Sequence, residues 1–200
     1  MSTTTASPFK KQASNSEGGN YEMAPAGTHP AVLVGLIDLG THTETFQGQA
    51  PKDAQKLYLI WELTSEHDSQ GRPFLVGQEY TYSLGKKAKL RSIVEGFLGR
   101  SLADGEEYDI AEMIGKPCVA TVKEGVTGAG KKYASLAGIG KPMKGLTVPQ
   151  PLTEPFTFAL ALCSAQADIP DFPEWIPFSY GRKVGDIVKD SKEYADLSPF

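Results

Sequence analysis

The sequence predicts a mainly β fold, in which a small barrel of five strands with one helix precedes a C-terminal appendage. Apolar and polar residues alternate with period two in several segments, which is typical of half-buried strands. Segment 86–98 instead has apolar residues at helical spacing. The chain of 200 residues is 40% hydrophobic and 22% charged, which fits one globular domain with flexible ends.

The first two predicted strands are 31–39 and 56–64. The first is apolar on both faces, which predicts a buried strand, and its Gly35 predicts a bend or bulge. In the second, Trp61 shares a face with three leucines, whereas Tyr58 shares the opposite face with Lys56. We therefore expect Trp61 in the core and the pair Lys56 and Tyr58 on an exposed binding face. Between the two strands, breakers predict a long loop over 41–55.

The remaining elements follow in chain order. A turn-rich connector precedes a third strand over 74–84. A helix is expected over 86–98, and Gly99 stands where a C-terminal cap would fall. Further predictions are a helical turn at 109–114, strands over 117–123 and 131–138, and a glycine-rich turn over 124–130.

Three strands, a helix and two more strands within about 120 residues is the element order of an OB-fold. This is a five-stranded Greek-key barrel with a helix between strands 3 and 4, and it binds oligonucleotides or oligosaccharides. Other five-stranded barrels share the strand order, but the position of the helix favours the OB-fold.

Composition divides the chain into four parts. We expect a disordered leader, the barrel domain, a Pro-rich and aromatic-rich acidic appendage, and a flexible acidic tail ending in Pro-Phe, over residues 1–20, 21–145, 146–185 and 186–200 respectively.

Charge is segregated along the chain, although the net charge is only -4. Residues 85–100 contain five cations and one carboxylate, whereas residues 146–177 contain four carboxylates and no Lys or Arg. A basic barrel beside an acidic extension suits a protein that binds phosphates with one part and repels them with the other.

Exposed aromatic side chains on a sheet can stack on bases of any sequence, while cations follow the phosphate backbone. For each aromatic the alternative is ordinary core or cross-strand packing. The candidate residues for binding DNA are the aromatic and basic side chains of the predicted barrel: Lys56, Tyr58, Arg72, Tyr80, Tyr82, Lys86, Lys87, Lys89, Arg91, Lys131, Lys132 and Tyr133. Lysines at the start of a helix also oppose its dipole, so a bound anion would relieve an unfavourable placement.

Several other classes of function lack the residues they need. Segment 125–132 matches a phosphate-binding loop except that Lys132 replaces its final Ser or Thr, and a strand follows it where such a loop requires a helix. The three histidines lack metal-ligand spacing, and Cys118 and Cys163 are interpreted as reduced structural residues. We therefore expect no catalysis, no metal and no cofactor. The sequence has neither a membrane-spanning run nor a signal peptide, so we expect a cytoplasmic protein.

The C-terminal residues Asp196, Pro199 and Phe200 form a candidate peptide ligand, with an aromatic for an apolar pocket and a carboxylate for a basic rim. This end resembles the C-terminal tip of bacterial single-stranded DNA-binding proteins, which implies recruitment of replication and repair enzymes.

A second resemblance covers about residues 21–194. The blocks that carry it are 27–41, 58–63, 80–91, 115–118 and 173–176, the last reading Pro-Glu-Trp-Ile. They resemble a family of bacteriophage and mobile-element replication proteins. That resemblance implies single-stranded DNA binding on an OB-fold, and it makes the appendage a recurring part of the fold.

The sequence therefore predicts a sequence-independent single-stranded DNA-binding protein of a phage or mobile element, active in a bacterial host. Its partners would be single-stranded DNA and, through the tail, replication or recombination proteins; self-association is left open. Two alternatives stand: a non-catalytic protein-docking factor of a phage replisome or recombination complex, and an oligosaccharide-binding or structural virion protein.

Overall fold

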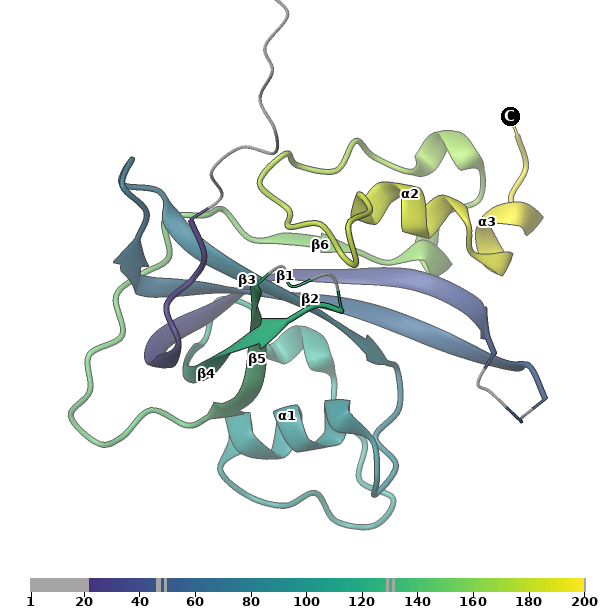
Figure 1. The fold of residues 1–200 in the computed structure, drawn as a ribbon. Coiled ribbons are helices and arrows are strands. Elements are labelled where there is room, and N and C mark those ends of the chain that lie inside the picture. Colours follow the sequence, from purple (N-terminus) through teal and green to yellow (C-terminus); the bar gives the residue numbers. More distant parts are fainter. Residues whose placement is uncertain (1–21, 46–47, 49, 129, 131, 200) are drawn as a thin grey trace, which may run out of the picture.

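Two long antiparallel strands form the centre of a six-stranded sheet in the computed structural model, which describes residues 22–45, 48, 50–128, 130 and 132–199. The fold is mainly β, as predicted. Neighbouring strands follow the order β3-β2-β1-β4-β5, and each pair along this path is antiparallel, whereas β6 lies parallel to β1 (Figure 1). The strands are β1 (Gly27–Glu44), β2 (Lys52–His67), β3 (Pro73–Thr81), β4 (Pro117–Val126), β5 (Lys132–Gly140) and β6 (Phe156–Phe158).

Strand β1 bends so that one of its edges serves two partners. Its residues 27–32 pair with β4, and its residues 35–37 pair with β6. The register with β2 shifts between Leu33 and Gly35 and again between Asp38 and Gly40. A Cβ at Gly35 would lie 2.6 Å from Cδ1 of Ile60, so only glycine fits there. The predicted bulge at Gly35 is confirmed.

Helix α1 (Lys89–Leu98) follows β3 in the chain and contacts β5 and β3. It ends at Gly99, which has a left-handed φ of 67° and donates its N–H to the carbonyl oxygen of Glu95 over 2.9 Å. The end of the helix and its glycine cap match the sequence prediction, whereas the predicted start is wrong because residues 86–88 lie before the helix. The helical turn expected near residue 110 is η1 (Ile110–Met113).

Each face of the central strands is covered by a different part of the chain. Figure 1 shows α1 on one side of β1 and β2, and the C-terminal helices on the other. The first core contains Leu33, Leu59 and Trp61 together with Leu90 and Val94 of α1. Trp61 is buried there, as the sequence predicted.

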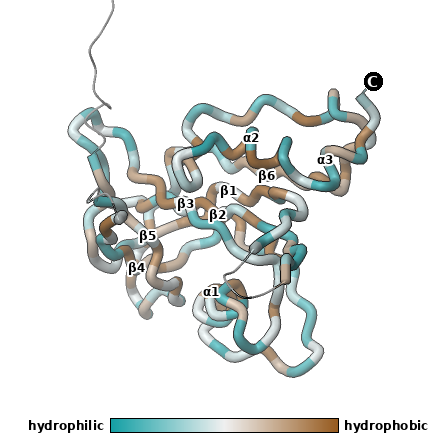
Figure 2. Tube along the Cα trace, turned by 45° about the vertical axis from the view of Figure 1, so that its right-hand side comes forward, coloured by the Kyte–Doolittle hydropathy of each residue, from teal (hydrophilic) through white to brown (hydrophobic). Residues whose placement is uncertain are grey.

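The second core joins the opposite face to the appendage. From the sheet it takes Val32, Val34, Ile37, Leu39, Tyr58 and Ile60, and from the appendage Phe158, Leu160, Val184, Ile187 and Val188. Figure 2 shows the apolar segments concentrated in the central strands and in α2. The appendage therefore belongs to the folded domain, because its removal would expose one whole face of β1 and β2.

The segment expected as a flexible tail, 186–200, is folded over most of its length. It contains the end of α2 (Val184–Lys189) and all of α3 (Lys192–Asp196). The Glu193 carboxylate accepts hydrogen bonds from the backbone N–H and hydroxyl of Thr41 on β1, at 2.7 and 2.5 Å. The apolar residues Ile187 and Val188 explain the difference, because they complete the second core. Two short helical turns precede α2, η2 (Leu160–Leu162) and η3 (Gln166–Asp168).

The expected long loop between the first two strands is mostly paired. Residues 40–44 of β1 pair with residues 52–56 of β2, so the connection shrinks to residues 45–51. The predicted loop 41–55 is therefore wrong over most of its length, because cross-strand pairs such as Thr43 with Asp53 satisfy its polar residues. The predicted leader, residues 1–20, lies outside the described residues. None of the helices described is long and apolar enough to cross a membrane.

Close packing between α1 and β5 gives a stability prediction. Gly→Ala usually stabilises a helix, but a Cβ at Gly96 would lie 2.0 Å from the carbonyl oxygen of Ile139. We therefore expect Gly96→Ala to lower the free energy of unfolding by about 1–3 kcal/mol in urea denaturation. The matched control is Gly138→Ala in β5, where an added Cβ meets nothing within 4 Å. This control should stabilise by about 0.5–1 kcal/mol. Equal effects of the two changes would contradict the packing described.

Candidate nucleic-acid interface

The aromatic residue expected to lead the binding face, Tyr58, is buried. Its side chain is 1% exposed, and its hydroxyl donates to the carbonyl oxygens of Pro177 and Phe178 at 3.2 and 3.4 Å. A Cβ at Gly77 of β3, which pairs with Ile60, would lie 2.0 Å from the Tyr58 hydroxyl. The prediction of an exposed Tyr58 is wrong, because the appendage covers this face of the sheet.

Lys56 is buried beside Tyr58 rather than presented to a ligand. Its ammonium group is paired with Glu44 and lies 3.8 Å from the Glu79 carboxylate. Two carboxylates compensate its charge, so Lys56 adds no positive potential for a phosphate. The prediction that Lys56 lies on an exposed face is therefore wrong as well.

Tyr80 belongs to the first core. Its ring packs edge-on against Trp61 with the centroids 6.3 Å apart, and burial raises the pKa of its hydroxyl. It cannot stack on a base without leaving the first core, so the alternative of core packing holds for this residue.

Two of the predicted tyrosines do reach solvent, Tyr82 just after β3 and Tyr133 on β5, and both are 47% exposed. Tyr133 pairs across the sheet with Gly125 of β4, and a Cβ at Gly125 would lie 2.5 Å from the Tyr133 ring. The Tyr133 ring therefore packs against the backbone of Gly125, which limits its movement. A ring fixed in this way loses little freedom when a base stacks on it.

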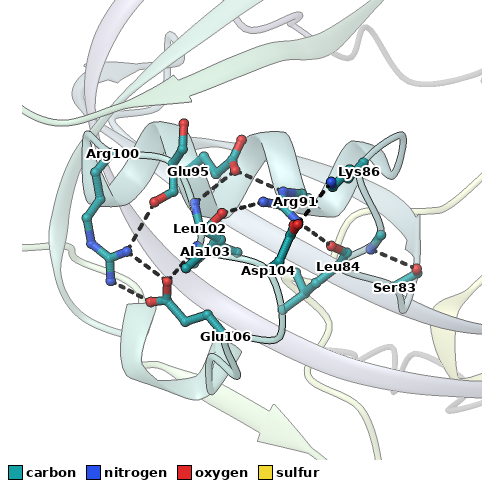
Figure 3. A network of polar contacts seen from close by, with 12 residues as sticks. Ser83, Leu84, Lys86, Arg91, Glu95, Arg100, Leu102, Ala103, Asp104 and Glu106 are labelled. Atoms are coloured by element: carbon teal, nitrogen blue, oxygen red, sulfur yellow. Dashed lines mark hydrogen bonds and ion pairs between the residues drawn. The ribbon is translucent and has the colours of Figure 1, made fainter.

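The cations around α1 divide into paired and free groups. Arg91 points inward, where it bonds Glu95 at 2.9 Å and the carbonyl oxygens of Leu84 and Leu102 (Figure 3). The expected phosphate contact at Arg91 is not supported, because these acceptors already occupy the guanidinium. Lys86 lies 3.2 Å from Asp104, and both side chains are well exposed.

Lys87 and Lys89 are exposed and form no ion pair with any residue that the structure describes. Helix α1 begins at Lys89, its preceding residue Ala88 offers no side-chain cap, and its first turn holds no acidic residue. An anion bound at this end of the helix would be stabilised both by the lysine charges and by the free backbone N–H groups.

The other predicted contacts are scattered. Arg72 pairs with Asp68 at 2.6 Å in the turn between β2 and β3, and Lys132 pairs with Glu124 at 2.8 Å. Both pairs are partly exposed, so a phosphate could replace the carboxylate in either one.

Lys131 and Phe200 lie outside the described residues. Asp196 and Pro199 are exposed at the end of the described chain.

Within the described ranges, no cluster of His, Cys, Asp or Glu could hold a metal ion. Cys118 is a buried free cysteine, and burial raises the pKa of its thiol to about 12. His29 is buried between Glu66 and the carbonyl oxygen of Pro25, at 3.2 and 3.0 Å.

Two features of the appendage escaped sequence reasoning. The buried Glu62 carboxylate accepts the backbone N–H groups of Leu152 and Thr153 at 2.7 and 2.8 Å, which fixes the start of the appendage on β2. The turn after Phe178 presents Tyr180 to solvent, where it is 88% exposed. The glycine in its sequence, Ser-Tyr-Gly-Arg, is typical of a tight hairpin turn, so the sequence does contain a feature that predicts this turn.

No protein-family model matches the sequence, and no curated protein matches it significantly. The resemblance to phage and mobile-element replication proteins therefore stays a prediction.

The network beside α1 makes a prediction for acid pH. Arg100 hydrogen-bonds the Glu106 carboxylate, which also accepts the N–H of Ala103, and together they lower the pKa of Glu106 from 4.5 to about 2. A lowered pKa in the folded state stabilises the fold above pH 4.5, and this contribution is lost as the pH falls toward 2. In carboxyl-detected NMR, Arg100→Gln should raise the Glu106 midpoint toward 4.5. An unchanged midpoint would show that Arg100 does not hold this carboxylate.

Proposed function

We propose that this chain is a sequence-tolerant single-stranded DNA-binding protein built on an OB-fold barrel, with no catalysis of its own. The strand path supports the barrel, because β1 pairs with both β2 and β4 and the two end strands, β3 and β5, contact each other. The position of α1, between β3 and β4 in the chain and against both end strands in space, supports the same assignment.

The observation that carries the proposal is a pair of half-exposed tyrosines, one just after the end strand β3 and one on the end strand β5, each close in sequence to lysines. Tyr82 precedes Lys86, Lys87 and Lys89. Tyr133 follows Lys132 on β5. Stacking contributes about 1–3 kcal/mol per base regardless of sequence, and lysines release counterions from the phosphates. We place the DNA along the meeting line of β3 and β5, because the appendage covers the outer face of β2 and β3.

In this proposal the protein protects single strands during replication or recombination of a phage or mobile element inside its bacterial host. The exposed residues Asp196 and Pro199, with Phe200 after them, would recruit the enzymes that act on the strand. The helices α2 and α3 anchor this end on the domain, so the recruiting segment is short.

One set of observations favours a second function, a protein-docking factor without DNA binding. Large apolar residues stand exposed along the appendage and the linker before it, namely Met143, Leu152, Leu162 and Phe178. Several cations are already paired within the chain. An electrophoretic shift on oligo-dT, compared with the same length of duplex, separates the two functions, since the docking factor would shift neither.

Stacking on the two tyrosines can be tested singly. Titration of the full chain with fluorescein-labelled oligo-dT, followed by anisotropy, should show that Tyr133→Ala and Tyr82→Ala each weaken binding roughly 5- to 150-fold. The control Leu162→Ala removes an apolar side chain of the appendage that is 85% exposed, and it should leave the affinity unchanged. Wild-type affinity in both tyrosine variants would rule out these platforms.

The lysines before α1 should determine the salt dependence. Replacing Lys87 and Lys89 together by Ala should reduce the slope of log K against log salt concentration by about 1.4, or about 0.7 for each lost phosphate contact. Lys189→Ala on α2 is the matched control, because it removes an exposed cation from the opposite side of the sheet. If the double variant and the control have equal slopes, the DNA phosphates do not contact Lys87 and Lys89.

A further inference from the structure

A two-residue hairpin turn projects from the appendage. Ser179 and Arg182 exchange both backbone hydrogen bonds, at 3.0 and 2.9 Å, and enclose Tyr180 and Gly181. Both enclosed residues have left-handed φ values, 49° for Tyr180 and 80° for Gly181. This is the turn in which Asn-Gly is favoured, because a bulky side chain is strained at positive φ.

A tyrosine at position 180 therefore costs folding free energy, because its φ of 49° is strained for a bulky side chain. Among the described residues it alone combines a positive φ with a side chain other than glycine. Its side chain is 88% exposed, so it gains almost nothing from burial. An exposed aromatic held in a strained conformation indicates a role outside the fold.

The turn is fixed in place rather than loosely attached. The Tyr58 hydroxyl binds the carbonyl oxygens of Pro177 and Phe178 just before it, and the Ser179 hydroxyl donates to the Glu79 carboxylate of β3 over 3.4 Å. Tyr58 and Glu79 pair across β2 and β3, so both anchors belong to one place on the sheet.

The aromatic side chains of the turn are accompanied by cations. Phe178 is 58% exposed and stands two residues before Tyr180. Arg182 pairs with Asp190 at 2.5 Å, whereas Lys183 is exposed and has no ion-pair partner among the residues described. Aromatic faces beside a free cation are the elements of a site that stacks bases and holds phosphate.

We propose that Tyr180 and Phe178 form an additional stacking platform for single-stranded nucleic acid, with Lys183 on the adjoining phosphate. This inference rests on the proposed function and extends its site onto the appendage. Glu79, which holds the turn, stands three residues before Tyr82, a separation of about 10 Å along the extended chain. One strand of the 4–16 nucleotides typical of an OB-fold is long enough to reach both tyrosines.

The test uses the full chain and the variant Tyr180→Asn, because asparagine tolerates the left-handed conformation. The melting temperature should rise by about 2–4 °C, while the affinity for oligo-dT should fall roughly 5- to 150-fold. Leu162→Asn, an equally exposed position on η2, is the control and should leave the affinity unchanged. Tyr180→Trp should retain binding and add fluorescence quenching by oligo-dT that the wild type lacks.

The outcomes separate this inference from the proposed function. Wild-type affinity in Tyr180→Asn, together with weakened binding in Tyr133→Ala, overturns the platform and leaves the DNA-binding proposal in place. Absence of any oligo-dT binding by the wild type overturns both. The platform is also overturned if Tyr180→Asn lowers binding of a poly-glutamate peptide but not of oligo-dT, since the turn would then bind protein. It is overturned again if Tyr180→Trp shows no added quenching.

Discussion

The structure depends on the burial of β1 and β2 on both faces. Val32, Val34 and Ile37 point to one core, whereas Leu33, Leu59 and Trp61 point to the other. A sheet with two apolar faces requires a cover on each, because either face left open would expose a large contiguous apolar surface. Helix α1 and η1 lie on one side, and segment 156–197 lies on the other. The appendage is therefore a structural requirement of this β1 sequence.

Covering the outer face also restricts where a ligand can bind. The positions on β2 and β3 that a flat ligand would use are occupied by the backbone of residues 177–179, through Tyr58 and Glu79. What remains accessible are strand ends and turns: Tyr82 after β3, Tyr133 over Gly125, and the hairpin at Tyr180. These positions present aromatic rings on rigid supports, so a bound strand would meet side chains that are already ordered. In the proposed function the DNA would therefore follow the edge strands and turns of the sheet and would not cross the face of β2 and β3.

Local signals in the sequence predicted local structure well. Gly99 terminates α1 because only a residue that tolerates positive φ can close that helix, and Gly35 marks a bulge because Ile60 leaves no room for a Cβ. The alternation of residues along segment 56–64 also correctly predicted that Trp61 lies in the core. The same period placed Tyr58, Lys56 and Glu62 together on one face but could not show that this face is buried. Their partners, Pro177, Glu44 and Leu152, are 12 to 119 residues away in the chain, and only folding brings them near. For the same reason the C-terminal helices were mistaken for a free tail.

In the proposed function, single-stranded DNA binds at the strand ends and turns while the outer face stays covered. Hydrogen–deuterium exchange with and without saturating oligo-dT tests it most directly, because it reports on each backbone segment separately. We expect slower exchange in residues 82–89, 132–134 and 178–183, with no change in residues 56–60. Altered exchange in residues 56–60, together with faster exchange in residues 177–188, would mean that DNA displaces the appendage and binds the face beneath it, which is the opposite of the proposed placement.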